Sequence, residues 1–412
     1  MRVLFIWELG SGLGHIAREV PIALELRRRG HEVLFVVRNL AAARAALGQH
    51  GIDFLQAPLP LLTRRVAQSP RQFRSYADIL AAAGFAEPRA LTDWIAGWKH
   101  TLALLRPQVV VCDYSPAAQL AAQLGGYPVV QVGTGFELPP VARLLPDTSP
   151  SGATPMAHLE QREQRVLHGI AAACVAAGHA PIQRVAQIYA TDAPLLATLP
   201  EVDCFGPRTS GGARYVGPLY AQTLGRAMDW PGGGGRRRVF AYLRGEYMRG
   251  RTALEAALSS LQRSGAAVIA CVPDADEELV ARYSGAAMQV SVQPVTLAPL
   301  LQDADLVISN AGAGLLAQAL LAGVPLLLLP WFLEQKLNAL AVTRSGAAAW
   351  ISSRKIAQQF DDMLARMLES EQYRQAARRI AHRHRGLTPE RTALDIAAII
   401  ESLGRGQRRQ DT

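Results

Sequence analysis

The chain has few of the residues that build disulfide frameworks or metal sites. It contains only four cysteines among 412 residues. They lie far apart and lack the paired spacing of a metal site: Cys112, Cys174, Cys204 and Cys271. Reduced thiols in the core of a cytoplasmic protein are therefore the simplest interpretation.

Long hydrophobic runs are also missing, although half of the residues are hydrophobic. The longest apolar tract, residues 319–333, is interrupted by Gly323, Pro325 and Pro330 and is too short to span a bilayer. The first apolar run breaks at Glu8, which favours a buried strand over a signal peptide. The net charge of +9 suits anionic ligands and allows peripheral membrane contact. Nucleic acid is not expected, because no basic run is interleaved with aromatic residues.

What the chain does contain is a strand–turn–helix pattern in the stretch Asp305–Asn338, DLVISNAGAGLLAQALLAGVPLLLLPWFLEQKLN. The apolar run 306–308 predicts a buried parallel strand, and the small residues 309–314 predict a turn before a helix. Free N–H groups in the first turn of such a helix bind anions. The spacing suits a diphosphate at this turn and a second polar group held by Glu334 and Gln335. A βαβ unit without a ligand has the same pattern.

This stretch resembles the donor-binding signature of the inverting UDP-glycosyltransferase superfamily, which has the GT-B architecture. The Ala-Gly-Val-Pro corner, Glu334-Gln335 and Asn338 match that signature. Asn310 stands where the family has His, Leu315 where it has Thr or Ser, and Gln318 where it has Glu. The resemblance, with Arg244 added as a substitute phosphate ligand, implies these donor-binding residues: Arg244, Asn310, Gly312, Ala313, Gly314, Leu315, Gln318, Glu334 and Gln335.

The N-terminal region has a glycine-rich turn after its first strand, Gly10-Ser11-Gly12-Leu13-Gly14-His15. No acidic residue ends the second strand, which counts against NAD. The turn and the following RGHEV instead resemble the opening of the acceptor domain in the same glycosyltransferases. That resemblance implies that His15 is the catalytic base and that Asp113, at the end of a later strand, orients it. An N-cap of the next helix is the alternative role for Asp113.

The acceptor site is less defined by the sequence. Gly12 lies in the glycine-rich turn, and Trp94 and Trp98 lie in a helical insertion of the kind that commonly carries an acceptor pocket. Ordinary core packing is the alternative for both tryptophans. The acceptor is expected to be a small molecule, a glycan or a lipid.

The expected fold is α/β, with two Rossmann-like, doubly wound parallel-sheet domains facing a cleft. We expect an acceptor-binding domain at 1–216, a linker at 217–236, a nucleotide-sugar domain at 237–388, and a closing helix and tail at 389–412 that cross back to the first domain. The Pro- and Gly-rich segment near 231–235 motivates this boundary.

The function that this resemblance implies is an inverting, metal-independent transfer of a sugar from a nucleoside diphosphate to an acceptor hydroxyl, with no cofactor besides the UDP- or dTDP-sugar. No metal ligands are expected, because the D-x-D pairs at 274–276 and 303–305 have the character of loop or cap positions. Two alternatives remain at this point: a nucleotide-sugar epimerase on the same scaffold, and a non-catalytic partner protein that binds the donor.

Overall fold

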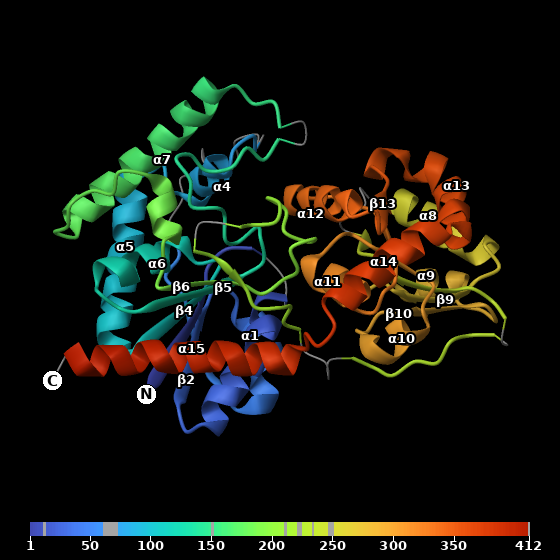
Figure 1. Ribbon diagram of the computed structural model, residues 1–412, viewed down its shortest axis with the longest axis horizontal. Helices are drawn as coiled ribbons and strands as arrows, with labels where there is room; N and C mark the ends of the chain where they lie inside the picture. Colours follow the sequence, from blue (N-terminus) through green and yellow to red (C-terminus); the bar gives the residue numbers. More distant parts are fainter. Residues whose placement is uncertain are drawn as a thin grey trace. The chain divides into compact units, whose positions relative to one another are not determined.

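The protein forms two compact units, each built on a parallel sheet (Figure 1). The computed structural model describes residues 1–10, 14–60, 73–149, 152–209, 212–220, 225–232, 235–245 and 251–410. The first unit comprises Met1–Thr198, Pro207–Tyr220 and Thr388–Thr412, and the second comprises Leu199–Gly206 and Ala221–Leu387.

The first unit contains a seven-stranded parallel sheet with the order β3-β2-β1-β4-β5-β6-β7. Its strands are β1 (Arg2–Trp7), β2 (Glu32–Val37), β3 (Asp53–Gln56), β4 (Val109–Asp113), β5 (Val129–Gly133), β6 (Ala193–Leu196) and β7 (Arg214–Tyr215). The strand order reverses direction between β1 and β4, which lie side by side with Trp7 opposite Asp113. In doubly wound sheets this reversal opens a crevice at the carboxyl ends of the strands, where ligands bind.

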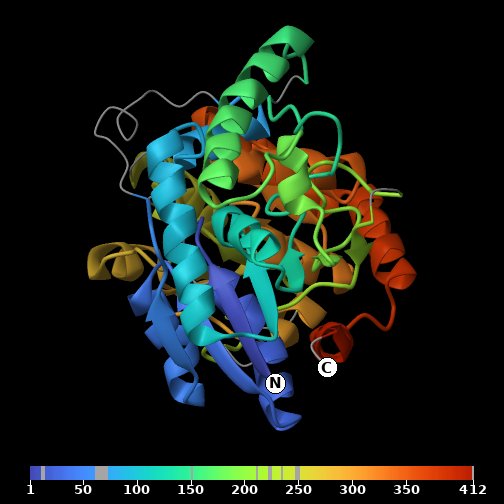
Figure 2. The same ribbon diagram turned by 90° about the vertical axis from the view of Figure 1, so that its left-hand side faces the viewer.

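Helices cover both faces of this sheet. They are α1 (Gly14–Arg28), α2 (Leu40–Leu47), α4 (Tyr76–Ala83), α5 (Pro88–Leu105), α6 (Pro116–Leu124), α7 (Met156–Ala176) and α15 (Pro389–Gln410), with 3₁₀ turns at Gly48–His50 and Val185–Tyr189. Helices α5 and α7 lie against each other, as Figure 2 shows in cyan and green. Between β3 and β4, the described residues 73–108 are thus largely helical, in keeping with their composition.

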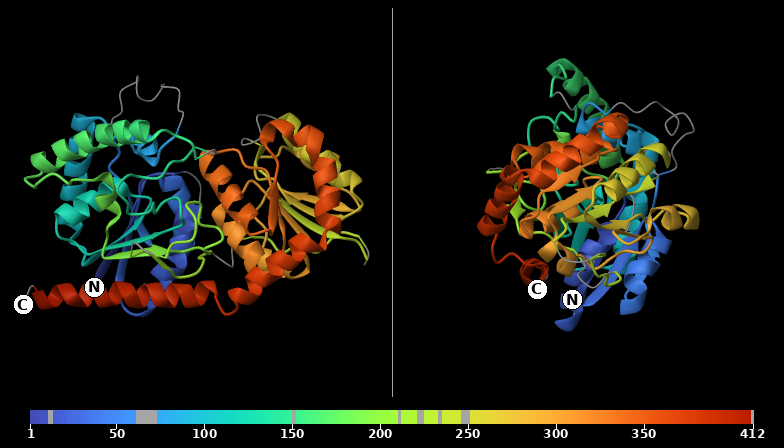
Figure 3. Two further views of the ribbon diagram at one scale, coloured as in Figure 1. Left: turned by 45° about the horizontal axis from the view of Figure 1, so that its top comes forward. Right: turned by 90° about the vertical axis from the view of Figure 1, so that its right-hand side faces the viewer.

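The closing helix α15 belongs to the first unit and packs on α1 (Figure 3, left). Its apolar side, including Ile396 and Ile400, joins the core cluster beneath α1 and β1. Glu401 accepts hydrogen bonds from Arg29 at 2.9 Å and lies 2.8 Å from Nε2 of His31. Apolar burial and these polar contacts together hold the end of the chain to the start of the first domain.

The second unit has a six-stranded parallel sheet with the order β10-β9-β8-β11-β12-β13. Its strands are β8 (Arg238–Tyr242), β9 (Ala267–Cys271), β10 (Met288–Ser291), β11 (Leu306–Ser309), β12 (Leu326–Leu328) and β13 (Ala348–Trp350). Its helices are α8 (Arg251–Arg263), α9 (Glu277–Tyr283), α10 (Leu297–Asp303), α11 (Ala313–Leu321), α12 (Leu333–Arg344), α13 (Ile356–Glu369) and α14 (Glu371–Arg383), with a 3₁₀ turn at Ser353–Lys355. Here the order reverses between β8 and β11, so each unit has its own ligand-binding edge.

The strand–turn–helix pattern predicted around residues 306–321 is confirmed as β11 followed by α11. Among the helices in the described part of the chain, none combines the length and apolar character that a bilayer crossing requires.

Candidate active site

The first sheet brings His15 and Asp113 together at the point where its strand order reverses. His15 is the second residue of α1, which follows β1 after the glycine-rich turn, and Asp113 is the last residue of β4. Because β1 and β4 are neighbours in parallel register, the turn after one strand lies beside the end of the other. Residues 98 positions apart in sequence thereby become hydrogen-bonding partners.

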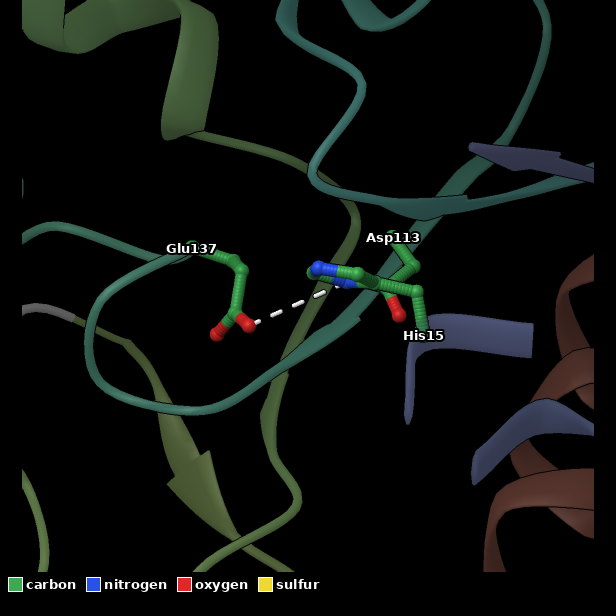
Figure 4. A group of neighbouring side chains, drawn as sticks. All are labelled: His15, Asp113 and Glu137. Carbon is green, nitrogen blue, oxygen red and sulfur yellow. Dashed lines mark hydrogen bonds and ion pairs between the residues drawn. The ribbon is translucent and has the colours of Figure 1, made fainter. Parts of the chain in front are cut away.

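The ring of His15 is held by its Nδ1 atom, which lies 3.1 Å from Oδ1 of Asp113. In Figure 4 the dashed line joins the imidazole to Glu137, whose Oε1 lies 3.9 Å from Nδ1. The Asp113 side chain is fully buried, and 13% of the His15 side chain is exposed. The rings of Trp7 and Tyr114 lie nearly parallel to the imidazole, at centroid distances of 5.4 and 6.1 Å. An Nδ1–H that donates to the carboxylate leaves Nε2 as the proton acceptor, which is the tautomer that a general base needs.

Gly10 makes room for this Nε2 atom. A Cβ atom at residue 10 would lie 2.4 Å from Nε2 of His15, and the residue has a φ of +82°. Both the contact and the left-handed backbone favour glycine. Arg38 donates from Nη1 to the carbonyl of Gly10 at 2.8 Å and so fixes the turn. Gly10 therefore leaves the space that the imidazole of His15 occupies.

Two further residues, Arg18 and Glu137, complete the cluster, and neither was identified from the sequence. Arg18 donates from Nη2 to Oδ2 of Asp113 at 2.5 Å and to Oε1 of Glu137 at 3.4 Å. Glu137 follows β5, and its other oxygen accepts from the backbone N–H of Thr134 at 2.7 Å. The i, i+3 spacing of His15 and Arg18 puts both on one face of α1, which is the one signal that the sequence carries for this contact.

The charges in this cluster shift its pKa values in opposite directions. Burial lowers the pKa of His15, but the negative charges of Asp113 and Glu137 outweigh that effect, so the pKa is raised above its usual 6.5. Burial raises the pKa of Asp113, but Arg18 and His15 outweigh it and hold that pKa below its usual value. The carboxylate is thus ionised at neutral pH and can support the imidazolium that forms on proton abstraction.

The same cluster has the composition of a metal site, but the positive charge of Arg18 opposes a bound cation there. One ligand atom from each of His15, Asp113 and Glu137 lies within 4.8 Å of the others. The guanidinium of Arg18 lies 2.5 Å from one carboxylate and 3.4 Å from the other. It already supplies the positive charge that a bound cation would bring, so a cation there would meet direct repulsion.

The two D-x-D pairs have structural roles. Asp276 accepts from the backbone N–H of Leu279 at 2.8 Å and caps α9. Asp305 accepts from the backbone N–H of Arg238 at 2.9 Å and from the Arg237 guanidinium. These positions act as caps and strand-edge contacts, in line with the interpretation from sequence.

Both tryptophans predicted to contact the acceptor are buried. Trp94 is 2% exposed and donates to the carbonyl of Pro58 at 2.8 Å, and Trp98 is fully buried. The Trp98 indole donates to Glu8, which also accepts from the backbone N–H groups of Ala117 and Ala118. This burial fits the core alternative for both tryptophans, with Trp98 supporting the end of β1. Gly12 lies outside the described residues.

In the second unit, Asn310 lies at the corresponding reversal point, between the ends of β8 and β11. Its Oδ1 accepts from the backbone N–H of Arg244 at 2.9 Å, and its Nδ2 donates to the carbonyl of Leu329 at 2.9 Å. Asn338 on α12 donates to the carbonyl of Ala311 at 3.2 Å. Asn310 therefore ties three strand ends together, and a contact of its side chain with a donor stays a prediction.

The start of α11 is open, as an anion-binding helix end requires. Gly312 is the N-cap, and no side chain in the described part of the chain caps the helix. A Cβ atom at Gly312 or Gly314 would meet nothing within 4 Å. Ala313 is buried between these two exposed glycines. The first-turn N–H groups thus border open space on the glycine side.

The remaining predicted donor-site residues lie on α11 and in the first turn of α12. Leu315 packs against the core, and Gln318 donates from Nε2 to the carbonyl of Gly314 at 3.2 Å. Gln335 accepts at Oε1 from the backbone N–H groups of Trp331 and Phe332 at 2.8 and 3.2 Å and so caps α12. Glu334 is partly exposed beside it. Their contacts with a nucleotide sugar remain predictions.

Comparison with known proteins agrees with this architecture. Residues 252–388 match the glycosyltransferase family 28 C-terminal domain. A PGL/p-HBAD biosynthesis glycosyltransferase of Mycobacterium tuberculosis is 24% identical over 396 residues, covering 92% of this chain and 88% of the relative. A PGL/p-HBAD biosynthesis rhamnosyltransferase of Mycobacterium bovis is 25% identical over 402 residues, covering 92% and 83%.

Solved glycosyltransferases have the same fold over nearly their whole length. SnogD from Streptomyces nogalater superposes with a TM-score of 0.64 at 23% identity, covering 97% of this chain and 99% of SnogD. VinC in complex with dTDP gives 0.68 at 18% identity, covering 98% and 100%. The expected GT-B architecture is therefore confirmed. With a family 28 C-terminal domain at residues 252–388 and this fold over the whole chain, the protein is a glycosyltransferase of the GT-B type.

Proposed function

We propose that this glycosyltransferase is an inverting enzyme that moves a sugar from a nucleoside diphosphate to an acceptor hydroxyl, with His15 as the general base and no metal ion. The observation that carries the proposal is the His15–Asp113 pair at the strand-order reversal, with Nδ1 engaged by the carboxylate. A neutral Nε2 would take the hydroxyl proton while the oxygen attacks the anomeric carbon. Asp113 would stabilise the imidazolium as it forms.

The leaving diphosphate would be bound in the second unit, at the N-terminus of α11. Its negative charge increases as the glycosidic bond breaks, and the transition state resembles an oxocarbenium ion. The open first turn after Gly312 offers backbone N–H donors and the positive end of the helix dipole. Direct in-line attack from the opposite face of the sugar would invert the anomeric configuration.

Product analysis tests the reaction class. We expect one equivalent of free nucleoside diphosphate for each glycoside formed, and a β product from an α-linked donor, or the reverse. The epimerase alternative forms a second nucleotide sugar and releases no nucleoside diphosphate. Binding of a nucleotide sugar with no turnover of any acceptor would favour the non-catalytic partner instead.

We expect dTDP to bind at least as tightly as UDP. In the resembled family a glutamate at the position of Gln318 commonly accepts from the ribose hydroxyls, whereas an amide has one acceptor oxygen and two donors. Gln318 also donates to the carbonyl of Gly314, which restrains its orientation. VinC has been solved with dTDP and the spinosyn rhamnosyltransferase SpnG with thymidine diphosphate. Calorimetric titration of both nucleotides measures the preference, and a strong preference for UDP would contradict it.

We also propose that Arg244 contacts the diphosphate. Its backbone N–H is fixed by Asn310 at the carboxyl end of β8, and residues 310 and 315 lack the histidine and hydroxyl that the resembled family places near the phosphates. A guanidinium can bind two phosphate oxygens at once, which lysine cannot reproduce. The alternative partner, Glu246, lies outside the described residues.

The expected result is that Arg244→Lys weakens nucleoside-diphosphate binding by about 1 kcal/mol or more and that Arg244→Ala weakens it further. Arg237→Lys is the matched control, since that side chain is already paired with Asp305. Calorimetry with the nucleoside diphosphate alone measures the effect. Wild-type affinity in both Arg244 variants would leave Arg244 with no role at the phosphates.

A further inference from the structure

Arg18 is a buried cation placed directly against the predicted base. Its side chain is 9% exposed, and its Nη2 atom lies 3.4 Å from Nδ1 of His15, 2.5 Å from Asp113 and 3.4 Å from Glu137. A buried guanidinium is stable only when carboxylates compensate it, and both of them come from other elements, β4 and the loop after β5. Burying a guanidinium costs free energy, and a base with one orienting carboxylate does not require it. The presence of Arg18 and Glu137 beside His15 therefore needs its own explanation.

The net charge around His15 explains why Arg18 and Glu137 are both present. With a neutral imidazole, the two carboxylates and Arg18 sum to −1, which is the same local charge as one carboxylate beside one histidine. Without Arg18 the imidazole would face two buried carboxylates, at 3.1 and 3.9 Å, and would be held in its protonated form. A protonated imidazole cannot accept the proton of an acceptor hydroxyl.

We propose that Arg18 and Glu137 are positioning residues: Arg18 occupies the second oxygen of Asp113 and opposes protonation of His15 by its positive charge, while Glu137 holds Arg18 in place. Asp113 then offers Oδ1 to the imidazole and Oδ2 to the guanidinium, so its orientation is fixed by two partners. Glu137 is itself held by Thr134, through its backbone N–H and its hydroxyl. The proposal rests on the proposed function only in giving His15 its role as the base.

The other charged groups around His15 do not reproduce this effect. Glu19 on α1 is fully buried, burial raises its pKa well above the usual value, and neither oxygen accepts a hydrogen bond from a described residue. Burial therefore favours the neutral form of Glu19. Glu8 after β1 is buried against the start of α6, and burial raises its pKa to about 8. Arg38 is bound to the carbonyl of Gly10, and the ring of Tyr114 lies nearly parallel to the imidazole.

The test is a measurement of the pKa of His15 by NMR with histidine labelled in its ring, the signal being assigned by its loss in His15→Gln. We expect Arg18→Met to raise this pKa by about one unit or more, because a like charge in contact is removed. Arg18→Lys keeps the charge and should stay closer to wild type. Glu137→Gln should lower the pKa, because it removes a carboxylate while Arg18 keeps its closer contact with Asp113.

The double variant Arg18→Met/Glu137→Gln restores the local charge of −1 and should return the pKa of His15 towards the wild-type value. Arg28→Met, on the exposed side of the same helix, is the matched control and should leave the pKa unchanged. The acidic limb of kcat/KM against pH should move with the NMR pKa in each variant. If Arg18→Met does not fold, Glu137→Gln and Arg18→Lys still test the charge effect.

An unchanged pKa of His15 in Arg18→Met and Glu137→Gln would overturn the proposal, even if turnover falls, because Arg18 would then be only structural. Failure of the proposed function is a separate result. If His15→Ala retains full activity, the assignment of the base is wrong, whereas the NMR shifts still report whether Arg18 and Glu137 set the charge of His15.

Discussion

His15→Ala is expected to lower turnover by about 10³-fold or more, towards the background rate, while the affinity for nucleoside diphosphate stays within a few-fold of wild type. The variant removes the Nε2 atom that would take the acceptor proton. The nucleotide, by contrast, is predicted to bind in the second unit, which contains no part of α1. Initial rates of glycoside formation and calorimetry with the nucleotide measure the two effects separately.

His100→Ala is the matched control for this experiment. His100 lies exposed on α5 of the same unit, so its loss should change neither rate nor affinity. Comparable activity in His15→Ala and wild type would refute the assignment of the base. A parallel loss of rate, nucleotide affinity and thermal stability would instead point to a folding defect.

Asp113→Asn is expected to lower turnover by roughly 10²-fold or more, through loss of the tautomer that leaves Nε2 free. The carboxylate of Asp113 has an oxygen for His15 and an oxygen for Arg18. An amide has only one oxygen, so its NH₂ group must face one of these two donors. Either His15 is released or the guanidinium of Arg18 loses its closest partner.

The direction in which the pH–rate profile of Asp113→Asn shifts shows whether the lost negative charge has changed the pKa of His15. In the wild type, the nearby carboxylates outweigh burial and raise the pKa of His15 above 6.5, so activity should fall as the pH drops through that raised value and the base becomes protonated. Asp113→Asn removes the largest cause of that rise. Its acidic limb should therefore move to lower pH, on a much lower plateau, and a limb that moves to higher pH would contradict this account.

Much of the architecture and of the candidate site could be predicted from the chain alone, because parallel sheets have strong local signals. Apolar runs such as 306–308 end at small residues before a helix. In a parallel sheet such residues lie at the carboxyl edge, whatever the order of the strands. The turn before His15 and the residue after 109–112 are at such edges. These edge positions, together with the resemblance to the glycosyltransferase family, led to the prediction of His15 and Asp113 as a pair, although 98 positions separate them.

Only the tertiary structure decided how the side chains at these edges are used. Asn310 is among the donor-binding residues predicted from sequence, and its amide is bonded to two backbone groups, of Arg244 and Leu329. Trp98 appears as an acceptor contact, yet it is buried against Glu8. The sequence pattern indicates that a residue lies at the carboxyl edge of a sheet, but it does not show which backbone N–H or C=O group lies next to the side chain. A buried polar side chain forms hydrogen bonds with such neighbouring groups, and only the folded structure shows which they are.

The Arg18–Glu137 pair is the clearest case of a feature that the sequence could not reveal. Helical spacing places Arg18 beside His15, but exposed arginines are common on the helices of this chain, and nothing local marks this one as buried. Its environment is set by Asp113 on β4 and by Glu137 on the loop after β5, both brought to it by the strand order. The prediction that His15 is the base thus rests on local sequence, whereas the charge state of His15 depends on three elements that meet only in the folded sheet.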